Sequence, residues 1–298
     1  MSDFRLKVFR STARHLSFTK AADEMCISQP AVTRHIKEIE SEYGQRVFER
    51  TNGRLILTKA GSTLLEHAER ILEQYDTLDF EMKRLRGEYA GELKIGASTT
   101  IAQYILPAAL ADFATRHPDI NLLLLNGNTT EVEEALIRHD IDLGLVEGIS
   151  RQLPLHYTAW LKDELVAVVR ANGSLARKEE ITTDELSTIP LVLREPGSGT
   201  LAVWHSALQH KGIPENTLHV IAQLGNSESI KRFISRYDAM GILSIRSVHQ
   251  EILNGQLKIV EIKDLPLQRV FHIVQRQGQE SGLTEKFLTY LHKCENSL

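Results

Sequence analysis

The sequence has few cysteines, which limits how the chain can be stabilised. Only Cys26 and Cys294 are present among 298 residues, near opposite ends of the chain. Two cysteines so far apart form neither a disulfide framework nor a CxxC metal site, so a reducing cytoplasm is expected. Cys26 is expected to be a small buried packing residue, with a redox switch as the alternative.

Long apolar runs are also missing. No stretch of eighteen apolar residues occurs, so no membrane segment is predicted. The first residues, Met1 to Arg5, lack the basic-then-apolar pattern of a secretory signal. A cytoplasmic protein that does not enter a membrane is therefore expected.

Motifs of common enzyme classes do not occur either. The histidines show no HExxH spacing, and no Gly-x-Ser-x-Gly nucleophile elbow is present. The stretch "PGSGT" at residues 196–200 has neither the spacing nor the lysine of a phosphate-binding P-loop. We therefore predict no enzyme, no cofactor and no metal site. A solute-binding receptor-like protein without a regulatory role and, less favoured, an enzyme stay open as alternatives.

Charge is distributed unevenly along the chain. The formal net charge is -4, yet residues 1–63 contain eleven Lys and Arg against seven Asp and Glu. The remaining residues contain twenty-four Lys and Arg against thirty-two Asp and Glu. A basic first segment on an acidic body indicates that this segment meets a polyanion, although so small an imbalance also occurs by chance.

Residues 1–60 contain the pattern of a helix-turn-helix. Ser17 precedes one apolar repeat, and Ser28, with Pro30 in the next turn, precedes a second. Serine caps the N–H groups at a helix start, and proline needs no N–H there. Gly44 ends the second helix, whose inward face is expected to hold Val32, Ile36, Ile39 and Tyr43. Such a pair of helices predicts that the second one enters the DNA major groove.

The start of this second helix carries side chains suited to base edges. Gln pairs with adenine, Arg pairs with guanine, and the Thr methyl contacts the thymine methyl. Two apolar runs around Asn52-Gly53 predict a β-hairpin whose arginines follow the phosphate backbone, unless they are only solvated. The predicted DNA-contacting residues are Ser28, Gln29, Pro30, Thr33, Arg34, Lys37, Arg50 and Arg54.

This part of the chain resembles a known family. The stretch "SFTKAADEMCISQPAVTRHIKEIE", followed by "VFER" and "LTKAG", is similar to the N-terminal domain of the LysR-type transcriptional regulators. Ile39 and Val47 stand where that family usually has leucine, and both keep an apolar packing role. The resemblance implies a winged helix-turn-helix that binds double-stranded DNA at a promoter operator.

Residues 61–90 show a heptad pattern. Apolar residues recur at alternating spacings of four and three, which is typical of a coiled-coil helix that pairs with a second copy. A helix packed on its own domain is the alternative, while the resemblance implies pairing. A homodimer and a homotetramer both stay open. The predicted dimerisation residues are Leu64, Ala68, Ile71, Tyr75, Leu78, Met82 and Leu85.

Residues 91–298 alternate strands with helices, which predicts an α/β domain with parallel sheets. Two such sets form two lobes, with lobe I at about 91–163 and 267–298 and lobe II at about 164–266. This arrangement resembles periplasmic-binding-protein-like folds and the LysR effector domain. The fold class is therefore multidomain: an all-α winged helix-turn-helix domain, a long linker helix and a two-lobed α/β effector domain.

Candidate effector residues lie at the carboxyl ends of the predicted strands. Open α/β sheets bind ligands there, and helix starts offer N–H groups to anions. Capping is the alternative for any single position. The predicted effector-binding residues are Ser98, Thr99, Thr100, Asn128, Thr129, Glu147, Ser198, Gly199, Thr200, Asn226 and Ser227.

The stretch "REPGSGT" at residues 194–200 resembles the corresponding loop of LysR-type regulators that sense small anionic metabolites. This resemblance implies a small anionic effector, either oxidised sulfur, a compact carboxylate or phosphate. The expected partners are promoter DNA, the small-molecule effector, a second copy of the chain and RNA polymerase. The effector would act from the cleft between the lobes.

Overall fold

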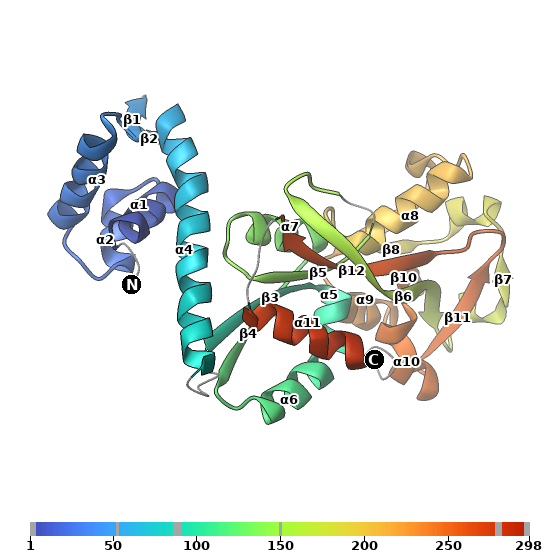
Figure 1. Cartoon of the computed structure of the whole chain (residues 1–298). Helices are drawn as coiled ribbons and strands as arrows, with labels where there is room; N and C mark the ends of the chain where they lie inside the picture. Colours follow the sequence, from blue (N-terminus) through green and yellow to red (C-terminus); the bar gives the residue numbers. More distant parts are fainter. Residues whose placement is uncertain (1–3, 52–53, 86–90, 149–150, 278–281, 295–298) are drawn as a thin grey trace. The chain divides into compact units, whose positions relative to one another are not determined.

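The computed structural model describes residues 4–51, 54–85, 91–148, 151–277 and 282–294. The chain separates into two compact units, Met1–Tyr89 and Ala90–Leu298 (Figure 1). Each unit has its own buried apolar core. The predicted Asn52-Gly53 turn lies outside the described residues.

The first unit is a set of helices with a two-stranded hairpin. Val32, Ile36 and Ile39 of its third helix are buried in the core, as the apolar repeat predicts. Tyr43 was expected to join them, but 58% of its surface is exposed. This prediction is wrong because residues 41–46 are all exposed, so the core does not reach the last turn of that helix. The elements are α1 (Phe4–His15), α2 (Phe18–Glu24), α3 (Gln29–Tyr43), β1 (Phe48–Thr51), β2 (Arg54–Leu57) and α4 (Lys59–Leu85).

Cys26 lies in the turn between α2 and α3 and is exposed, so the expectation of a buried packing residue is wrong. Its backbone has φ 54°, in the left-handed region. Its N–H donates to the carbonyl of Asp23 at 3.3 Å, and the N–H of Ile27 donates to that of Ala22 at 3.0 Å. These paired bonds form a Schellman motif, which needs a left-handed residue where Cys26 stands. Ile27 takes the packing role, because it lies against the core.

Helix α4 contributes to the core of its own unit. Ala68 and Leu72 are fully buried there, and Leu64 packs against the same cluster. Leu64 and Ala68 were predicted to face a partner helix, and this is wrong for Ala68 because its unit already covers it. Beyond them, Ile71, Leu78 and Met82 are about half exposed.

The second unit is built on a mixed sheet whose strands lie in the order β4-β3-β5-β12-β6-β10-β8-β9, with β11 beside β6 and β7 beside β11. Short 3-10 turns lie at Leu175–Arg177, Asp184–Thr188 and Glu215–Thr217. The helices are α5 (Thr99–Tyr104), α6 (Leu106–Arg116), α7 (Thr129–Ile137), α8 (Gly199–His210), α9 (Ser227–Ile234), α10 (Ile245–Leu253) and α11 (Gly282–Cys294). The strands are β3 (Gly91–Ser98), β4 (Ile120–Gly127), β5 (Leu143–Glu147), β6 (Leu155–Arg170), β7 (Glu180–Ile181), β8 (Leu191–Arg194), β9 (Val220–Leu224), β10 (Met240–Ser244), β11 (Leu257–Ile262) and β12 (Gln268–Arg276).

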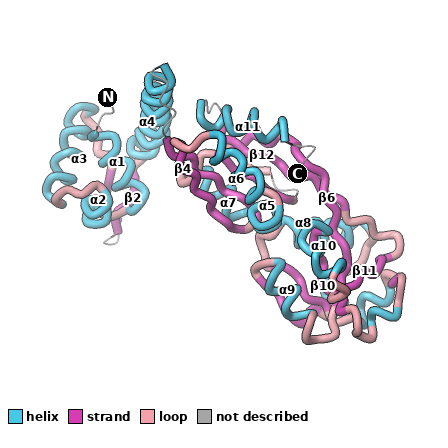
Figure 2. The backbone as a smooth tube through the Cα atoms, turned by 90° about the horizontal axis from the view of Figure 1, so that it is seen from below, coloured by secondary structure: helices cyan, strands magenta, loops and turns pink. Residues whose placement is uncertain are grey.

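The predicted α/β character is confirmed, but the strands are not all parallel. β3 runs parallel to β4 and β5, and β8 runs parallel to β9 and β10. The long strands β6 and β12 are antiparallel to each other and to the strands beside them, β10 and β5. They join the parallel set of β3, β4 and β5 to that of β8, β9 and β10. Figure 2 shows the two parts of this unit, with α6, α7 and α11 in one and α8, α9 and α10 in the other. Three buried apolar clusters support the predicted two lobes. One lies around Val132 and Leu136 in the first lobe, and the other two lie around Trp204 and Ile230 in the second.

One helical prediction differs from the structure. The sequence pattern of residues 101–117 predicts a single helix, but the helix breaks at Ile105 between α5 and α6. The cause is Pro107, which lacks an N–H and would clash with the preceding turn of a continuous helix. At the other end of the chain, α11 packs beside α6 in the first lobe, as expected (Figure 1). There the ring of Phe287 lies 5.0 Å from that of Phe113.

Candidate functional site

The start of α3 is fixed by its own residues. The hydroxyl of Ser28 accepts a hydrogen bond from the N–H of Ala31 at 3.4 Å, and Pro30 occupies the first turn. Gly44 ends the helix in the left-handed conformation with φ 62°. Both ends of α3 therefore form as the capping residues predict.

The outward face of α3 carries the predicted base-reading residues together. Gln29 donates from Nε2 to the hydroxyl of Thr33 at 3.0 Å, and this hydroxyl lies 3.2 Å from the carbonyl of Gln29. The side chain of Arg34 is 70% exposed, with Nε 3.7 Å from Glu38. A shallow depression runs along this face, lined by Pro30, Thr33, Arg34, Lys37, Glu38, Ser41 and Glu42. The face is thus available to a large partner. Glu38 and Glu42 also line it, and the sequence analysis did not include these two residues.

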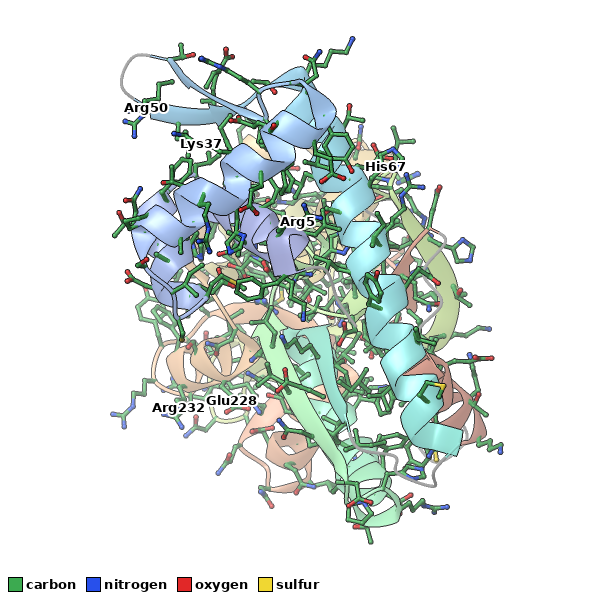
Figure 3. The ribbon with its side chains drawn as sticks, turned by 60° about the vertical axis from the view of Figure 1, so that its left-hand side comes forward. Arg5, Lys37, Arg50, His67, Glu228 and Arg232 are labelled. Atoms are coloured by element: carbon green, nitrogen blue, oxygen red, sulfur yellow. The ribbon has the colours of Figure 1, made fainter. Side chains whose placement is uncertain are left out.

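The hairpin presents its arginines to solvent. β1 and β2 are antiparallel, with Thr51 opposite Arg54 and Arg50 opposite Leu55. Arg50 and Arg54 are both exposed. Figure 3 shows Lys37 projecting from α3 and Arg50 projecting from the hairpin. This arrangement suits contact with a polyanion.

An apolar stripe continues along α4 beyond the part that packs on its own unit. Ile71 is 44% exposed, Leu78 53% and Met82 51%, while Tyr75 is half-buried. A shallow depression lies over this stripe, lined by His67, Arg70, Ile71, Gln74, Tyr75 and Leu78. The side chain of Leu85, the last predicted residue of the seam, is outside the described residues.

In the second unit, the four predicted helix starts divide into two kinds. Asn128 accepts from the N–H of Glu131 at 3.0 Å, and Asn226 accepts from the N–H of Ser229 at 2.8 Å. These two residues are caps, as the alternative interpretation expected. Ser98 and Ser198 precede α5 and α8 but make no capping bond. Their hydroxyls are buried without a hydrogen-bond partner.

Two buried arginines connect these helix starts, and neither was predicted as a site residue. Arg269 donates to the hydroxyl of Thr200 at 2.9 Å and to that of Thr100 at 3.4 Å. Thr100 and Thr200 are the second residues of α5 and α8, so one guanidinium holds both helix starts. Arg194 donates to the hydroxyl of Thr99 at 3.2 Å. No signal in the sequence singled out Arg269, because β12 also carries the polar residues Gln268, His272, Gln275 and Arg276.

The charges of these arginines are balanced differently. Arg269 forms ion pairs with Glu147 at 2.6 Å and Asp163 at 2.7 Å, and all three groups are buried. Arg194 pairs with Glu195 through two bonds of 2.8 and 2.9 Å. Its Nη1 atom is buried without a hydrogen-bond partner. Arg194 therefore keeps a donor for a further acceptor.

Close backbone packing explains the glycine at the start of α8. A Cβ atom on Gly199 would lie 2.0 Å from the carbonyl oxygen of Glu147. The hydroxyl of Thr129 donates to that same oxygen at 2.5 Å. Gly148 follows with φ 108°, and a Cβ there would lie 2.8 Å from the Cα of Gly199. The carboxyl end of β5 and the starts of α7 and α8 thus meet at the carbonyl of Glu147.

A second polar cluster surrounds the start of α9, where Ser227 is buried. Tyr104 of α5 donates to Glu228 at 2.5 Å, and Lys231 lies 2.6 Å from Glu228 and 2.7 Å from Glu251. Burial, together with the hydrogen bond to Glu228, raises the pKa of Tyr104. Burial acts to raise the pKa of Glu228, but the hydrogen bonds from Lys231 and Tyr104 outweigh it and lower that pKa. Tyr104 is therefore a neutral donor to an ionised carboxylate.

The described part of the chain contains no group of three or more His, Cys, Asp or Glu side chains placed to hold a metal ion. None of the helices within the described ranges is long and apolar enough to cross a membrane.

Known proteins resemble this chain over nearly its whole length. The RuBisCO operon transcriptional regulator of Acidithiobacillus ferrooxidans is 29% identical over 288 residues, which cover 96% of this chain and 92% of that protein. The HTH-type transcriptional regulator YeiE of Escherichia coli K12 is 32% identical, over 96% of this chain and 95% of that one. The Synechocystis PCC6803 CcmR regulatory domain, solved in complex with 2-PG, superposes with a TM-score of 0.63. It is 26% identical and covers 70% of this chain and 99% of its own.

The family matches divide the chain much as the structure does. Residues 4–62 match the bacterial regulatory helix-turn-helix protein, lysR family, and residues 86–294 match the LysR substrate binding domain. The first match contains the capped helix α3, and the second contains the buried helix starts and their arginines. The chain belongs to the LysR family and is a LysR-type DNA-binding transcriptional regulator with an effector-binding domain.

Proposed function

We propose that this regulator reads promoter DNA with the first turn of α3 and that a small anion bound beside Ser98, Ser198 and Arg194 changes this DNA binding. The observation that carries the proposal is the pair of buried serine hydroxyls that do not cap their helices. A buried polar group without a partner is unfavourable, and a bound ligand that supplies the partner removes this cost.

The groups at this site favour an anion. Arg194 contributes a buried donor at Nη1, and the serine hydroxyls can each donate one hydrogen bond. α8 adds the N–H groups and the partial positive charge of a helix start. Arg269 is not the counter-charge of the ligand, because Glu147 and Asp163 already neutralise it. Arg194 is likewise paired with Glu195, so the anion is held mainly by neutral donors and by the N–H groups on Nη1 of this guanidinium.

The relative of known structure supports a small ligand in this domain. The CcmR regulatory domain, 26% identical to this chain, was solved in complex with 2-PG. For this chain we propose oxidised sulfur, phosphate or a compact carboxylate. Sulfate, sulfite, phosphate and short dicarboxylates are the probes that separate these classes.

The DNA contacts follow from the exposed face of α3. We assign Gln29, Thr33 and Arg34 to base edges, with Lys37 and the hairpin arginines on phosphates. Ser28 and Pro30 fix the start of the helix and so aim these side chains. The chain works as a gene regulator in the cytoplasm rather than as an enzyme. RNA polymerase is the partner whose activity at the promoter it regulates.

The exposed stripe of α4 supports a dimer. Ile71, Tyr75, Leu78 and Met82 recur at spacings of four, three and four residues, which is the period of a paired helix. A dimer would place two copies of α3 in successive major grooves, roughly 34–36 Å apart, over an interrupted palindrome. A tetramer, formed through the second unit, is compatible with the same stripe.

The test measures DNA affinity with and without anions. Fluorescence anisotropy of the full chain on a labelled duplex from the region upstream of its own gene is followed at constant ionic strength. We expect at least one of the four probe anions to change the affinity for DNA, and the Ser98→Ala plus Ser198→Ala variant to lose this response while it keeps the basal affinity. If no anion changes the affinity for DNA or the melting temperature, the anion proposal is wrong.

The salt dependence tests the DNA proposal separately. Neutralising about six to ten phosphates makes the affinity fall by roughly 10³ to 10⁵ between 50 and 200 mM salt. An affinity that stays flat over this range would contradict DNA binding through Lys37 and the hairpin arginines.

A further inference from the structure

Two side chains on the outward face of α3 are joined to each other within the helix. Nε2 of Gln29 lies 3.0 Å from Oγ1 of Thr33, and the same hydroxyl lies 3.2 Å from the backbone carbonyl oxygen of Gln29. The two residues are four positions apart, so they are neighbours on one face of the helix. Among the described residues, Thr33 is the only hydrogen-bond partner of the Gln29 side chain.

The backbone carbonyl decides how the hydroxyl of Thr33 is used. A carbonyl oxygen only accepts, so the single proton of this hydroxyl is donated to the carbonyl of Gln29. The hydroxyl therefore meets the carboxamide of Gln29 through a lone pair, and it faces the NH2 group and not Oε1. One N–H of Gln29 is thus bound to Thr33, while Oε1 and the second N–H remain for another partner.

Thr33 is held more firmly than the side chain that it contacts. Gln29 is exposed, whereas Thr33 is half-buried and follows the fully buried Val32 in the chain. The branched side chain of Thr adopts few rotamers in a helix, and its bond to the backbone carbonyl restricts it further. The carboxamide of Gln29 is therefore tied to a fixed group. A side chain held in this way loses less conformational entropy when it binds a base.

The two free groups of Gln29 match one purine better than the other. In the major groove, adenine presents the N6–H donor and the N7 acceptor, whereas guanine presents two acceptors, O6 and N7. Oε1 can accept from N6 of adenine while the second N–H donates to N7. With guanine, Oε1 would face the O6 acceptor, or the N–H already bound to Thr33 would be needed. Either arrangement loses a hydrogen bond, which is unfavourable once water is excluded.

Helix stability alone does not account for this pair. Ser28 already caps α3, and Pro30 occupies its first turn. Arg34, the other long side chain proposed to read a base on this face, has its Nε 3.7 Å from Glu38, which is too long for a hydrogen bond. The hydrogen bond to a fixed hydroxyl therefore distinguishes Gln29 from Arg34.

We propose that Thr33 is the positioning residue of Gln29 and that the pair makes α3 select adenine over guanine at one base pair of the operator. This inference rests on the proposed contact of α3 with base edges, and it adds the base that is read and the residue that enforces the choice. The hydroxyl of Thr33 acts through Gln29, because its own proton is already donated to the backbone. Its methyl group takes no part in these hydrogen bonds.

Selection of duplexes from a random library by the full chain, followed by sequencing, gives the base preference at each operator position. Gln29→Ala identifies the position that Gln29 reads, because the preference there is lost. At that position, we expect the unmodified chain to prefer adenine over guanine by about tenfold or more, the scale of one bidentate contact. Thr33→Val keeps the branched shape without the hydroxyl and should reduce this preference by about threefold or more, the scale of one neutral hydrogen bond.

Two variants serve as controls. Thr33→Ser keeps the hydroxyl without the methyl group and should retain the preference for adenine. Thr115 donates its hydroxyl to the carbonyl of Ala111 at 2.8 Å on an exposed part of α6, so Thr115→Val removes a bond of the same kind in the other unit. This variant should leave the base preference unchanged. Thermal melting by circular dichroism verifies that each variant is folded, and affinity for random duplexes should stay constant because phosphate contacts are kept.

Three results would overturn the inference while leaving the proposed base contacts of α3 in place. The position read by Gln29 could prefer a base other than adenine, Thr33→Val could keep the full preference, or Thr33→Ser could lose it as Thr33→Val does. A different result would show the failure of the proposed function. If Gln29→Ala changes the preference at no position, the contact of Gln29 with a base edge is itself wrong, and the inference falls with it.

Discussion

Ser28 at the start of α3 and Ser198 at the start of α8 are alike in sequence but differ in the structure. The hydroxyl of Ser28 is at the surface and accepts from the backbone at 3.4 Å. The hydroxyl of Ser198 is buried and has no hydrogen-bond partner. The first serine completes a helix, whereas the second leaves a donor for something else. The same residue type before a helix is thus a cap in one unit and a buried hydroxyl without a hydrogen-bond partner in the other.

The two units also differ in how amino-acid substitutions near these serines affect stability. On α3, Gln29, Arg34 and Lys37 are exposed, so their substitution should affect the partner and not the fold. Around α5 and α8 the polar residues are buried and linked through Arg269, so substitution there affects stability as well. Both tryptophans, Trp160 and Trp204, lie in the second unit, so their fluorescence reports unfolding of that unit.

The largest effect is expected for Arg269→Met. Glu147 would remain buried without its counter-charge and Asp163 would keep only Arg246 as a counter-charge, at 3.7 Å; breaking a buried ion pair in this way costs about 3–5 kcal/mol. Urea unfolding followed by tryptophan fluorescence measures this loss. Arg177→Met, at an exposed position, is the control and should stay within about 0.5 kcal/mol of the unmodified chain. A small loss of unfolding free energy for Arg269→Met would mean that Arg269 and its ion pairs do not hold the starts of α5 and α8 together.

The next effect is on DNA and not on stability. Arg34→Ala should weaken specific DNA binding by about 1–3 kcal/mol, the range for a bidentate contact with a base. Its unfolding free energy should change by less than about 0.5 kcal/mol, because the side chain is exposed. Gel-shift titrations on specific and random duplexes separate the roles, since an equal loss on both would make Arg34 a phosphate contact.

A smaller loss of stability is expected for Ser28→Ala. Removing the cap leaves an N–H at the start of α3 unsatisfied, which costs about 1 kcal/mol. Thermal melting of the first unit by circular dichroism measures this change. Ser28→Asp, which also caps helices, should retain the stability. If Ser28→Asp lost as much stability as Ser28→Ala, the hydroxyl would not act as a cap.

The smallest effect is expected to be stabilising. Cys26→Gly should raise the free energy of unfolding of the first unit by about 0.5–1 kcal/mol, because glycine adopts φ 54° without steric cost. The same thermal melting experiment measures it, and Cys26→Ala serves as the control that removes only the thiol. Equal stabilities of the two variants would show that backbone conformation does not decide this position.

The sequence predicted the local elements well where caps and apolar repeats are strong. Ser17, Ser28 and Gly44 bound the helices of the first unit as expected. The interior of the second unit was harder to predict, because β6 and β12 pair over a long separation in sequence and reverse the strand direction. The helix α10 and the strand β11 were not anticipated, since their apolar residues show no clear boundary with their neighbours.

The candidate site was predicted only in part, for a related reason. The hydroxyl residues at helix starts are visible in the sequence, but their hydrogen-bond partners are not. Asn128 and Asn226 are caps, and Ser98 and Ser198 are not. Arg269 lies 69 residues from Thr200 and 169 from Thr100 along the chain, so only the folded sheet brings them together.

We propose that Ser198 is available for a ligand, whereas Ser28 is a cap. The most direct measurement compares Ser198→Ala with Ser28→Ala in unfolding free energy and in affinity for the four probe anions. Ser198→Ala should be neutral or slightly stabilising, because it removes a buried group without a partner, and it should weaken anion binding. Ser28→Ala should lose about 1 kcal/mol of stability and keep the anion affinity. A Ser198→Ala variant that loses stability as Ser28→Ala does, and still binds the anion with full affinity, would contradict the account.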